Sequence, residues 1–378
     1  MKIKFRVVIS LNTAWNLYNF RSGLIAALIN SGSEVIAVAP NDKYVEHVKS
    51  LGCHFVPIEI ATQGINPFRD LFLFIRFYLL LRRIRPSVFL GYTVKPNIYG
   101  SIAAHLLGIP VVNNIAGLGS VFVREDWVTR IVKLLYWLAL FRSKRVFFQN
   151  EDDRQLFIKW GLVDSKITSR LPGSGINLNK FSQTSMPIDN TSVKFLLISR
   201  MLWEKGVGEY VEAAKLLKSR SVKAEFYLLG FLDLKNASAI SRDQMNLWVK
   251  DGFVSYLGET DDVRPHIASA NCIVLPSFYR EGVPRTLLEA CAIGRPIITT
   301  NTVGCRELVD DGQNGYLCKA RDAYDLAEKM EWFVALSLRQ QAEMGDLSRK
   351  KIEQTFDEMI VINQYLDAIS DITHVSDV

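Results

Sequence analysis

Short apolar runs alternate with longer amphipathic segments along the first half of the chain. Residues 5–11 and 34–39 predict buried strands, and residues 20–29 predict the helix between them. A strand, a helix and a second strand in this rhythm indicate a parallel sheet with right-handed crossovers. The alternation continues with predicted strands at 88–90, 110–115 and 145–149 and predicted helices at 68–84, 98–107 and 127–141.

The second half repeats this alternation after a polar, turn-rich segment at residues 182–192. Strands are predicted at 194–198, 226–229, 254–257 and 272–275. A single core rarely grows past roughly 250–300 residues, so a chain of 378 residues indicates two domains. We therefore predict an α/β protein with domains at residues 1–185 and 186–355, and an amphipathic helix in the tail at 356–378.

Two segments follow predicted strands of the first domain, where doubly wound sheets bind ligands. Residues 12–19 are predicted as the loop after the first strand. Lys95 follows the strand at 88–90 and is placed to meet an anionic ligand, although a lysine on a loop is commonly only solvated.

The composition is that of a globular protein with reduced cysteines. Hydrophobic residues make up 49% and charged residues 22%, with a net charge of +6, which is typical of a globular chain. The five cysteines are odd in number and lack C-x-x-C spacing, so they predict reduced packing residues in a cytoplasmic protein. We expect no signal peptide, no transmembrane helix and no nucleic-acid partner.

Residues 271–294 carry the candidate chemistry. A predicted strand ends at Pro276, and a helix is predicted from Pro284 at its first position to Gly294 just past its end. Glu281 lies in the loop, and Glu289 lies on the helix between apolar neighbours. A carboxylate in such surroundings needs hydrogen bonds. A sugar diol would supply them, and so would an arginine; the helix N-terminus would favour a diphosphate.

The spacing Glu-(seven residues)-Glu within this stretch resembles the donor-site signature of the retaining family 4 glycosyltransferases. The resemblance continues through residues 294–298, 304–309 and 311–316. It implies the GT-B fold, in which two Rossmann-like doubly wound domains face each other across a cleft and the last helix crosses back to the first domain. Residues 12–19 lack the glycine pair that many relatives carry after the first strand.

The resemblance also implies roles for individual residues. Arg200 and Lys205 would hold the diphosphate and stabilise the leaving group, so no metal and no other cofactor are expected. Glu281 would contact the donor sugar, either supporting front-face attack or acting as a nucleophile, and Glu289 would hold the ribose hydroxyls. The remaining donor-binding positions implied are Gly282, Val283 and Thr286. We assign no catalytic histidine.

Further segments resemble bacterial enzymes that extend lipid-linked glycans in O-antigen, capsule and N-glycan assembly: 19–21, 66–68, 95–100 and 202–207. This implies a UDP-linked donor such as UDP-N-acetylgalactosamine and an undecaprenyl-diphosphate-linked acceptor, with Lys95 and Asn97 on the acceptor side. Two alternatives stay open. One is a UDP-sugar epimerase of the same fold, and the other is a non-catalytic subunit of a glycan assembly complex. Mixing the protein with a UDP-sugar and a lipid-diphosphate acceptor and measuring the release of UDP separates the transferase from both.

Two predicted helices of the first domain suggest contact with the inner face of the cell membrane. Arg130, Lys133 and Lys144 share one side of the helix that begins at Trp127, and arginines recur every seven residues on the helix at 68–84. Such helices lie in an anionic membrane interface, or their apolar sides pack on the sheet.

Overall fold

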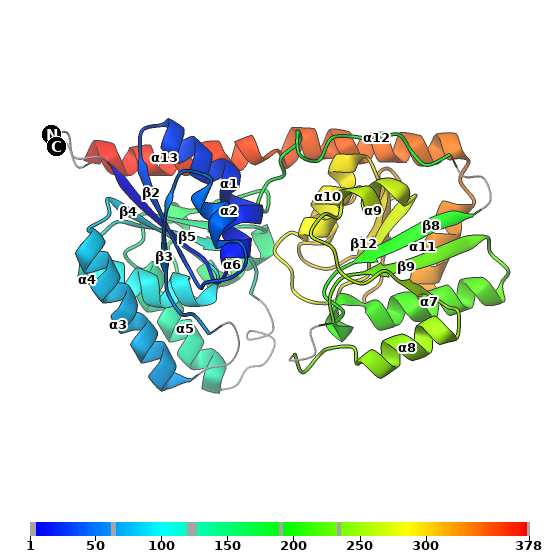
Figure 1. Ribbon diagram of the computed structural model, residues 1–378, viewed down its shortest axis with the longest axis horizontal. Coiled ribbons are helices and arrows are strands. Elements are labelled where there is room, and N and C mark those ends of the chain that lie inside the picture. The colour runs from blue at the N-terminus through cyan, green and yellow to red at the C-terminus, as the bar shows by residue number, and fades with distance from the viewer. Residues whose placement is uncertain (1–4, 62–65, 119–126, 189–191, 233–235, 376–378) are drawn as a thin grey trace. The chain divides into compact units, whose positions relative to one another are not determined.

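The computed structural model describes the chain apart from residues 1–4, 62–65, 119–126, 189–191, 233–235 and 376–378 (Figure 1). The chain forms two compact units, Met1–Gly175 with Glu358–Val378, and Ile176–Asp357. The first division lies at Gly175 instead of residue 185, because Ile176 packs in the core of the second unit and its N–H donates to the carbonyl of Phe356 at 2.9 Å.

Seven parallel strands form the sheet of the first unit, in the order β3-β2-β1-β4-β5-β6-β7. The five central strands were predicted, and the two edge strands β3 and β7 were not. Their bounds are β1 (Arg6–Ser10), β2 (Glu34–Ala39), β3 (His54–Pro57), β4 (Val88–Tyr92), β5 (Val111–Ile115), β6 (Arg145–Phe148) and β7 (Thr168–Arg170).

The helix after β1 begins earlier than predicted. Residues 12–19 are not a loop, since α1 spans Ala14–Asn30. The Thr13 hydroxyl accepts from the Asn16 N–H at 3.0 Å, and the Asp42 carboxylate accepts from the Trp15 N–H at 3.0 Å. These side chains accept hydrogen bonds from amides of the first helical turn, which have no partner within the helix. The helix can therefore begin at Ala14, although several residues of its first turns are polar.

The other helices of the first unit include a π-helical turn that leads directly into α4. Asn66 caps α3, where its side chain accepts from the Arg69 N–H at 3.1 Å and Pro67 occupies the first position. The bounds are α2 (Val45–Lys49), α3 (Pro67–Ile84), η1 (Pro96–Gly100), α4 (Ser101–Leu106), α5 (Trp127–Leu140), α6 (Glu151–Lys159), the 3₁₀ turn η2 (Ser165–Ile167) and α13 (Glu358–Val375).

Alternate residues of the strands divide the core of the first unit into two faces. Val7 and Ile9 of β1 pack with α1 and α13, whereas Val8 packs with α3 and α4. The amphipathic tail is held by Tyr365, which lies among these residues and accepts from the Asn114 amide at 2.9 Å. The last helix therefore completes the fold of the first unit, although the whole second unit, residues 176–357, lies between it and the other elements in the sequence.

Six parallel strands form the second sheet, in the order β10-β9-β8-β11-β12-β13. Their bounds are β8 (Val193–Ile198), β9 (Ala224–Leu229), β10 (Ser255–Tyr256), β11 (Cys272–Leu275), β12 (Ile297–Thr300) and β13 (Gly315–Cys318). Both units are thus Rossmann-like, as expected. The strand order reverses between β1 and β4 in the first sheet and between β8 and β11 in the second. Ligands of such folds bind at this reversal, beyond the carboxyl ends of the strands.

Helices cover both faces of the second sheet. One face packs against α7, α8 and α11, and the other against α9, α10 and α12. Their bounds are η3 (Trp203–Lys205), α7 (Val207–Ser219), α8 (Arg242–Lys250), α9 (Arg264–Ser269), α10 (Arg285–Ile293), η4 (Arg306–Leu308), α11 (Ala323–Val334) and α12 (Leu338–Thr355). The connections after β8 and β11 lie side by side, since the N–H groups of Phe278 and Tyr279 donate to the carbonyl of Glu204.

Candidate functional site

The connection after β8 carries Arg200 and Lys205. It ends in the 3₁₀ turn η3, and Gly206 then takes the left-handed backbone conformation, with a φ of 77°. A Cβ on Gly206 would lie 2.1 Å from the carbonyl oxygen of Pro276. Only glycine therefore allows this turn to pack directly against the end of β11.

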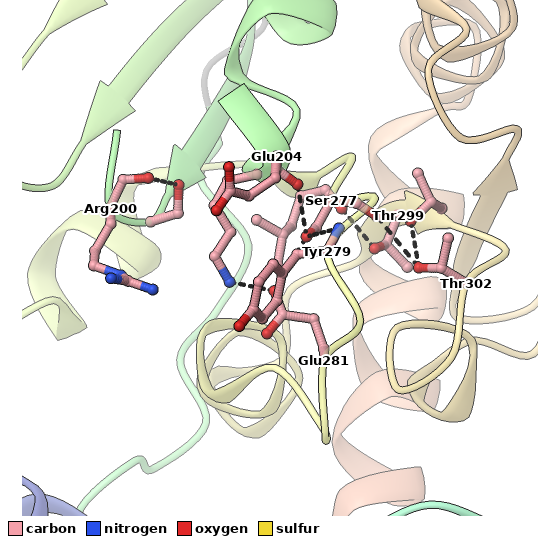
Figure 2. A network of polar contacts seen from close by, with 11 residues as sticks. Arg200, Glu204, Ser277, Tyr279, Glu281, Thr299 and Thr302 are labelled. Atoms are coloured by element: carbon pink, nitrogen blue, oxygen red, sulfur yellow. Dashed lines mark hydrogen bonds and ion pairs between the residues drawn. The ribbon is translucent and has the colours of Figure 1, made fainter. Parts of the chain in front are cut away.

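The connection after β11 is anchored on the same turn (Figure 2). The N–H groups of Phe278 and Tyr279 both donate to the carbonyl of Glu204, at 3.0 and 3.1 Å. Ser277 is fully buried, and its carbonyl accepts from the hydroxyls of Thr300 and Thr302 at the end of β12. Three strand ends are thus tied into one polar network.

Lys205 and Glu281 form an ion pair inside this network. The Lys205 ammonium contacts Glu281 Oε1, and the Ser277 hydroxyl lies 3.1 Å from the same oxygen. Both charged side chains are about seven-eighths buried, with 14% and 13% exposed. The Lys205 ammonium also lies 5.1 Å from the centre of the Tyr279 ring. Arg200 lies five residues before Lys205 in the same connection, and its side chain is exposed (Figure 2).

The next residues lead into α10. Gly282 and Val283 are buried, and a Cβ on Gly304 would lie 2.0 Å from the Gly282 carbonyl, so a second close backbone contact holds this loop. Pro284 precedes the helix instead of occupying its first position, because its ψ of 121° is extended. Its carbonyl accepts from the N–H groups of Leu287 and Leu288 at 3.2 Å. Thr286, in the first turn, is half-buried.

Glu289 pairs with an arginine, and that arginine is on its own helix. Arg285 Nε donates to Glu289 Oε1 at 3.0 Å, one turn away. Burial raises the pKa of Glu289, and the Arg285 guanidinium opposes that rise. Lys180 lies close to both side chains; burial, followed by Arg285 and Arg264, lowers its pKa. Two cations, Arg285 and Lys180, therefore lie close to the one carboxylate of α10.

In the first unit, Lys95 and Asn97 line a pocket of about 260 Å³ at the ends of β1, β4 and β5, together with Asn12, Thr93 and Tyr136. Lys95 is not simply solvated, because its ammonium lies 2.8 Å from the buried carboxylate of Asp70.

Asn97 is more deeply placed than a residue of an exposed loop. It is 1% exposed, its amide donates to the Asn114 carbonyl at 2.8 Å, and its oxygen accepts from Asn113 at 2.9 Å. The strand β4 continues through Tyr92, and the π-helical turn η1 begins at Pro96, so little of the predicted loop is left. The hydrogen bonds of Asn97 therefore hold η1 against β5 beside the pocket.

The structure brings Lys205, Glu281, Gly282 and Val283 together, with Arg200 on the same connection as Lys205. The sequence reasoning missed Ser277, which joins the β8 and β11 connections, and Arg285, which pairs with Glu289. Arg285 had a signal: on a helix, a spacing of four residues puts an arginine and a glutamate on one face. Ser277 lies within the stretch singled out, but only the fold shows its contacts.

Two family profiles match the chain in sequence order. The profile described as "Glycosyl transferase 4-like domain" matches residues 20–170, and that described as "Glycosyl transferases group 1" matches residues 192–335. A Campylobacter jejuni protein, N,N'-diacetylbacillosaminyl-diphospho-undecaprenol alpha-1,3-N-acetylgalactosaminyltransferase, is 30% identical over 370 residues, covering 93% of this chain and 94% of the relative. The Escherichia coli UDP-Gal:alpha-D-GlcNAc-diphosphoundecaprenol alpha-1,3-galactosyltransferase is 28% identical, covering 72% of each chain.

Solved structures show the same fold. HepE from Anabaena, in complex with UDP and glucose, superposes with a TM-score of 0.80 at 16% identity, covering 97% of this chain and all of that one. A glycosyltransferase from Rickettsia africae superposes with a TM-score of 0.79 at 16% identity, over 98% and 99% of the two chains. The whole-length relative, the two profiles and the shared fold show that this chain belongs to the family 4 glycosyltransferases of the GT-B fold.

Proposed function

We propose that the chain transfers a hexosyl unit from a UDP-sugar to an undecaprenyl-diphosphate-linked glycan, with retention of the anomeric configuration and without a metal ion. The names of the Campylobacter and Escherichia coli relatives support the acceptor class, since both contain a diphospho-undecaprenol sugar. UDP-N-acetylgalactosamine is the donor suggested by the more similar of these two, and the pathway would be assembly of a surface polysaccharide or an N-glycan.

The observation that carries the proposal is the Lys205–Glu281 ion pair at the ends of β8 and β11. A cation and a carboxylate held together, with Arg200 on the same connection as Lys205, suit a donor that has a diphosphate at one end and a sugar at the other. Lys205 and Arg200 would stabilise the charge that develops on UDP as it leaves. Glu281 would accept from a sugar hydroxyl and stabilise positive charge near the anomeric carbon.

The bond that breaks joins the anomeric carbon to the β-phosphate oxygen, and its electron pair leaves with UDP. The acceptor hydroxyl attacks the same face of the sugar, which retains the configuration, and its proton passes to the departing phosphate oxygen. In this mechanism Glu281 orients and stabilises but forms no bond to the sugar. Glu289, Gly282, Val283 and Thr286 would hold the nucleoside and the sugar around the start of α10.

The first unit would hold the acceptor. Its pocket contains Lys95, whose ammonium would favour a diphosphate although it is already paired with Asp70. Because the proposed acceptor is anchored in a bilayer, the enzyme would act at the cytoplasmic face of the membrane as a peripheral protein. Over the described residues, no helix combines the length and hydropathy needed to span a bilayer.

The proposal is tested by measuring UDP release from a panel of UDP-sugars, with and without a polyprenyl-diphosphate-linked sugar. We expect release that depends on the acceptor and that persists in EDTA. Interconversion of the UDP-sugar without an acceptor would indicate an epimerase, and absence of turnover with every donor and acceptor would indicate a non-catalytic subunit. Activity lost in EDTA and restored by manganese would contradict the metal-independent mechanism.

A further inference from the structure

Helix α5 presents large apolar side chains to solvent. Its buried side contains Val132, Tyr136 and Ala139, which pack on the sheet. Ile131 and Leu138 lie outside that buried side, and both are exposed. The residues exposed along α5 and immediately after it are Trp127, Ile131, Leu134, Trp137, Leu138 and Phe141.

Helix α3 has a second exposed apolar stripe. Leu73, Phe77 and Leu81 pack inward, at the spacing expected for a helix on a sheet. A different set recurs at helical spacing on the outer side, and Phe68 is 77% exposed. This outer set is Phe68, Leu71, Phe72, Ile75 and Leu79. A helix that needs only one apolar face for packing thus has two.

Both helices lie on the same face of the first sheet. Val8, Phe89 and Val111 pack with α3 and α4, while Ile115 and Phe148 pack with α5. These strand residues point to the face opposite α1 and α13. Helix α4 contacts α3 and α5 (Figure 1). Leu106 of α4 is 66% exposed. The exposed residues of α3, α4 and α5 are here called the α3–α5 surface.

The charges on this surface have one sign. Arg69, Arg76, Arg82 and Arg83 on α3 are exposed, and so is Arg130 on α5. The sequence of α5 contains no Asp or Glu, and the one acidic residue of α3 is Asp70, which is buried against Lys95. On α3, Arg76 pairs with the exposed Glu59 from outside the helix.

We propose that the α3–α5 surface lies in the interface of an anionic lipid bilayer. Exposed Phe, Trp and Leu side chains would enter the boundary between headgroups and acyl chains, and the arginines would meet lipid phosphates. A second copy of this chain fits less well, because the same surface would bring arginines against arginines.

This membrane-binding surface rests on the proposed function in one respect: the lipid-linked acceptor identifies the membrane as the one that holds the acceptor. The 260 Å³ pocket is lined partly by Tyr136, on the buried side of α5, so the pocket and the α3–α5 surface share a helix. An acceptor whose polyprenyl chain stays in the bilayer would therefore have its diphosphate close to Lys95. Vesicle binding itself needs neither donor nor acceptor, so the two proposals fail separately.

The test is co-flotation of the full chain with phosphatidylcholine vesicles containing about 30 mol% phosphatidylglycerol and no polyprenyl lipid. The variant Phe72→Ser/Leu134→Ser removes one exposed apolar side chain from each helix. We expect its partitioning to fall about tenfold or more. The matched control is Leu247→Ser/Leu347→Ser, which removes two exposed apolar side chains from α8 and α12 of the second unit. This control should bind as the wild type does, and thermal melting checks that both variants fold.

A second measurement uses variants that keep an aromatic ring. Vesicles with brominated acyl chains should quench the tryptophan fluorescence of the wild type, and Trp127→Phe/Trp137→Phe should lose most of this quenching. The proposal is overturned if Phe72→Ser/Leu134→Ser floats like the wild type, or if the wild type shows no quenching. It is also overturned if the wild type ignores vesicles and instead forms dimers that this variant abolishes.

Discussion

The Lys205 ammonium contacts the Glu281 carboxylate, although the two residues are 76 positions apart in the chain. One lies after β8 and the other after β11, and these strands are neighbours in the sheet. The Ser277 hydroxyl, 3.1 Å from the same Glu281 oxygen, ties the pair to the end of β11. In the proposed reaction Lys205 serves the phosphate end of the donor, and Glu281 serves the sugar end.

This division predicts different kinetic effects. Glu281→Gln should lower kcat about 100-fold or more, because a neutral amide stabilises developing positive charge poorly, with a change of less than about threefold in the Kd for UDP. Lys205→Met should weaken UDP binding about tenfold, since it removes a charge-assisted contact. Steady-state kinetics and calorimetry with UDP measure both. Equal losses of UDP affinity in the two variants would contradict the separate roles.

Glu289 is predicted to bind ribose with a pH dependence set by its surroundings. Because burial raises its pKa, Glu289 takes up a proton at a higher pH than an ordinary glutamate, and UDP affinity should fall as the pH drops through that pKa. Glu289→Gln should cost about 1–3 kcal/mol of UDP binding at neutral pH.

The partner of Glu289 supplies the control. Arg285→Gln removes the cation that opposes the rise, so the loss of UDP affinity should begin at a higher pH than in the wild type. Calorimetric titrations with UDP between pH 5 and 8 would show this, and the Glu289→Gln variant reports the titration of UDP alone. The same midpoint in wild type and Arg285→Gln would mean that Glu289 does not hold the nucleotide.

Lys95 should have a structural role that can be separated from acceptor binding. Lys95→Met leaves the Asp70 carboxylate buried without its cation, which should cost about 3–5 kcal/mol of stability. Adding Asp70→Asn should restore most of this loss in urea unfolding. If Lys95 also binds the acceptor diphosphate, the stable double variant should keep a raised KM for the acceptor and an unchanged KM for the donor. A normal acceptor KM would leave Lys95 with its structural role alone.

Gly206 is predicted to be essential for the geometry of the donor site. Gly206→Ala would place a Cβ 2.1 Å from the Pro276 carbonyl and would also strain the backbone. Gly252 offers a matched control, since its φ of 73° is similar but nothing lies within 4 Å of a Cβ there. We expect Gly252→Ala to cost about 1 kcal/mol and Gly206→Ala clearly more, with loss of UDP binding. Equal midpoints of urea unfolding would show that the close contact relaxes freely.

The alternation of apolar runs predicted the five central strands of the first sheet and the strands β8 to β11 of the second, because buried parallel strands are continuously apolar. It did not predict β12 and β13 of the second sheet. It missed β3 and β7, which lie at the sheet edges and need little apolar surface: β3 begins at His54, and β7 is Thr168–Arg170. The start of α1 was also missed, although Thr13 is a local signal, because its hydroxyl accepts from the Asn16 N–H three residues further on. The second acceptor at this end, Asp42, comes from a distant segment and could not be predicted.

The parts of the candidate site that depend on local sequence were predictable. Pro284, Glu289 and Gly294 show that a helix follows the loop of Glu281, and the resemblance supplied Lys205. Contacts between distant segments could not be predicted, because no local pattern shows that Lys205 contacts Glu281 or that Asp70 contacts Lys95. The sequence showed that α3 is rich in apolar residues on more than one side. It did not show which of these sides packs on the sheet, because that depends on where the strands lie.

The most direct test of the account is the anomeric configuration of the product formed from a UDP-α-sugar and a polyprenyl-diphosphate-linked acceptor. We predict an α-linked sugar on the lipid-linked acceptor. The wild type should form it equally fast with and without EDTA, and Glu281→Gln should form it at least about 100-fold more slowly than the wild type. Nuclear magnetic resonance of the extended glycan distinguishes the two anomers. A β-linked product, or an α-linked product formed equally well by Glu281→Gln, would contradict the account.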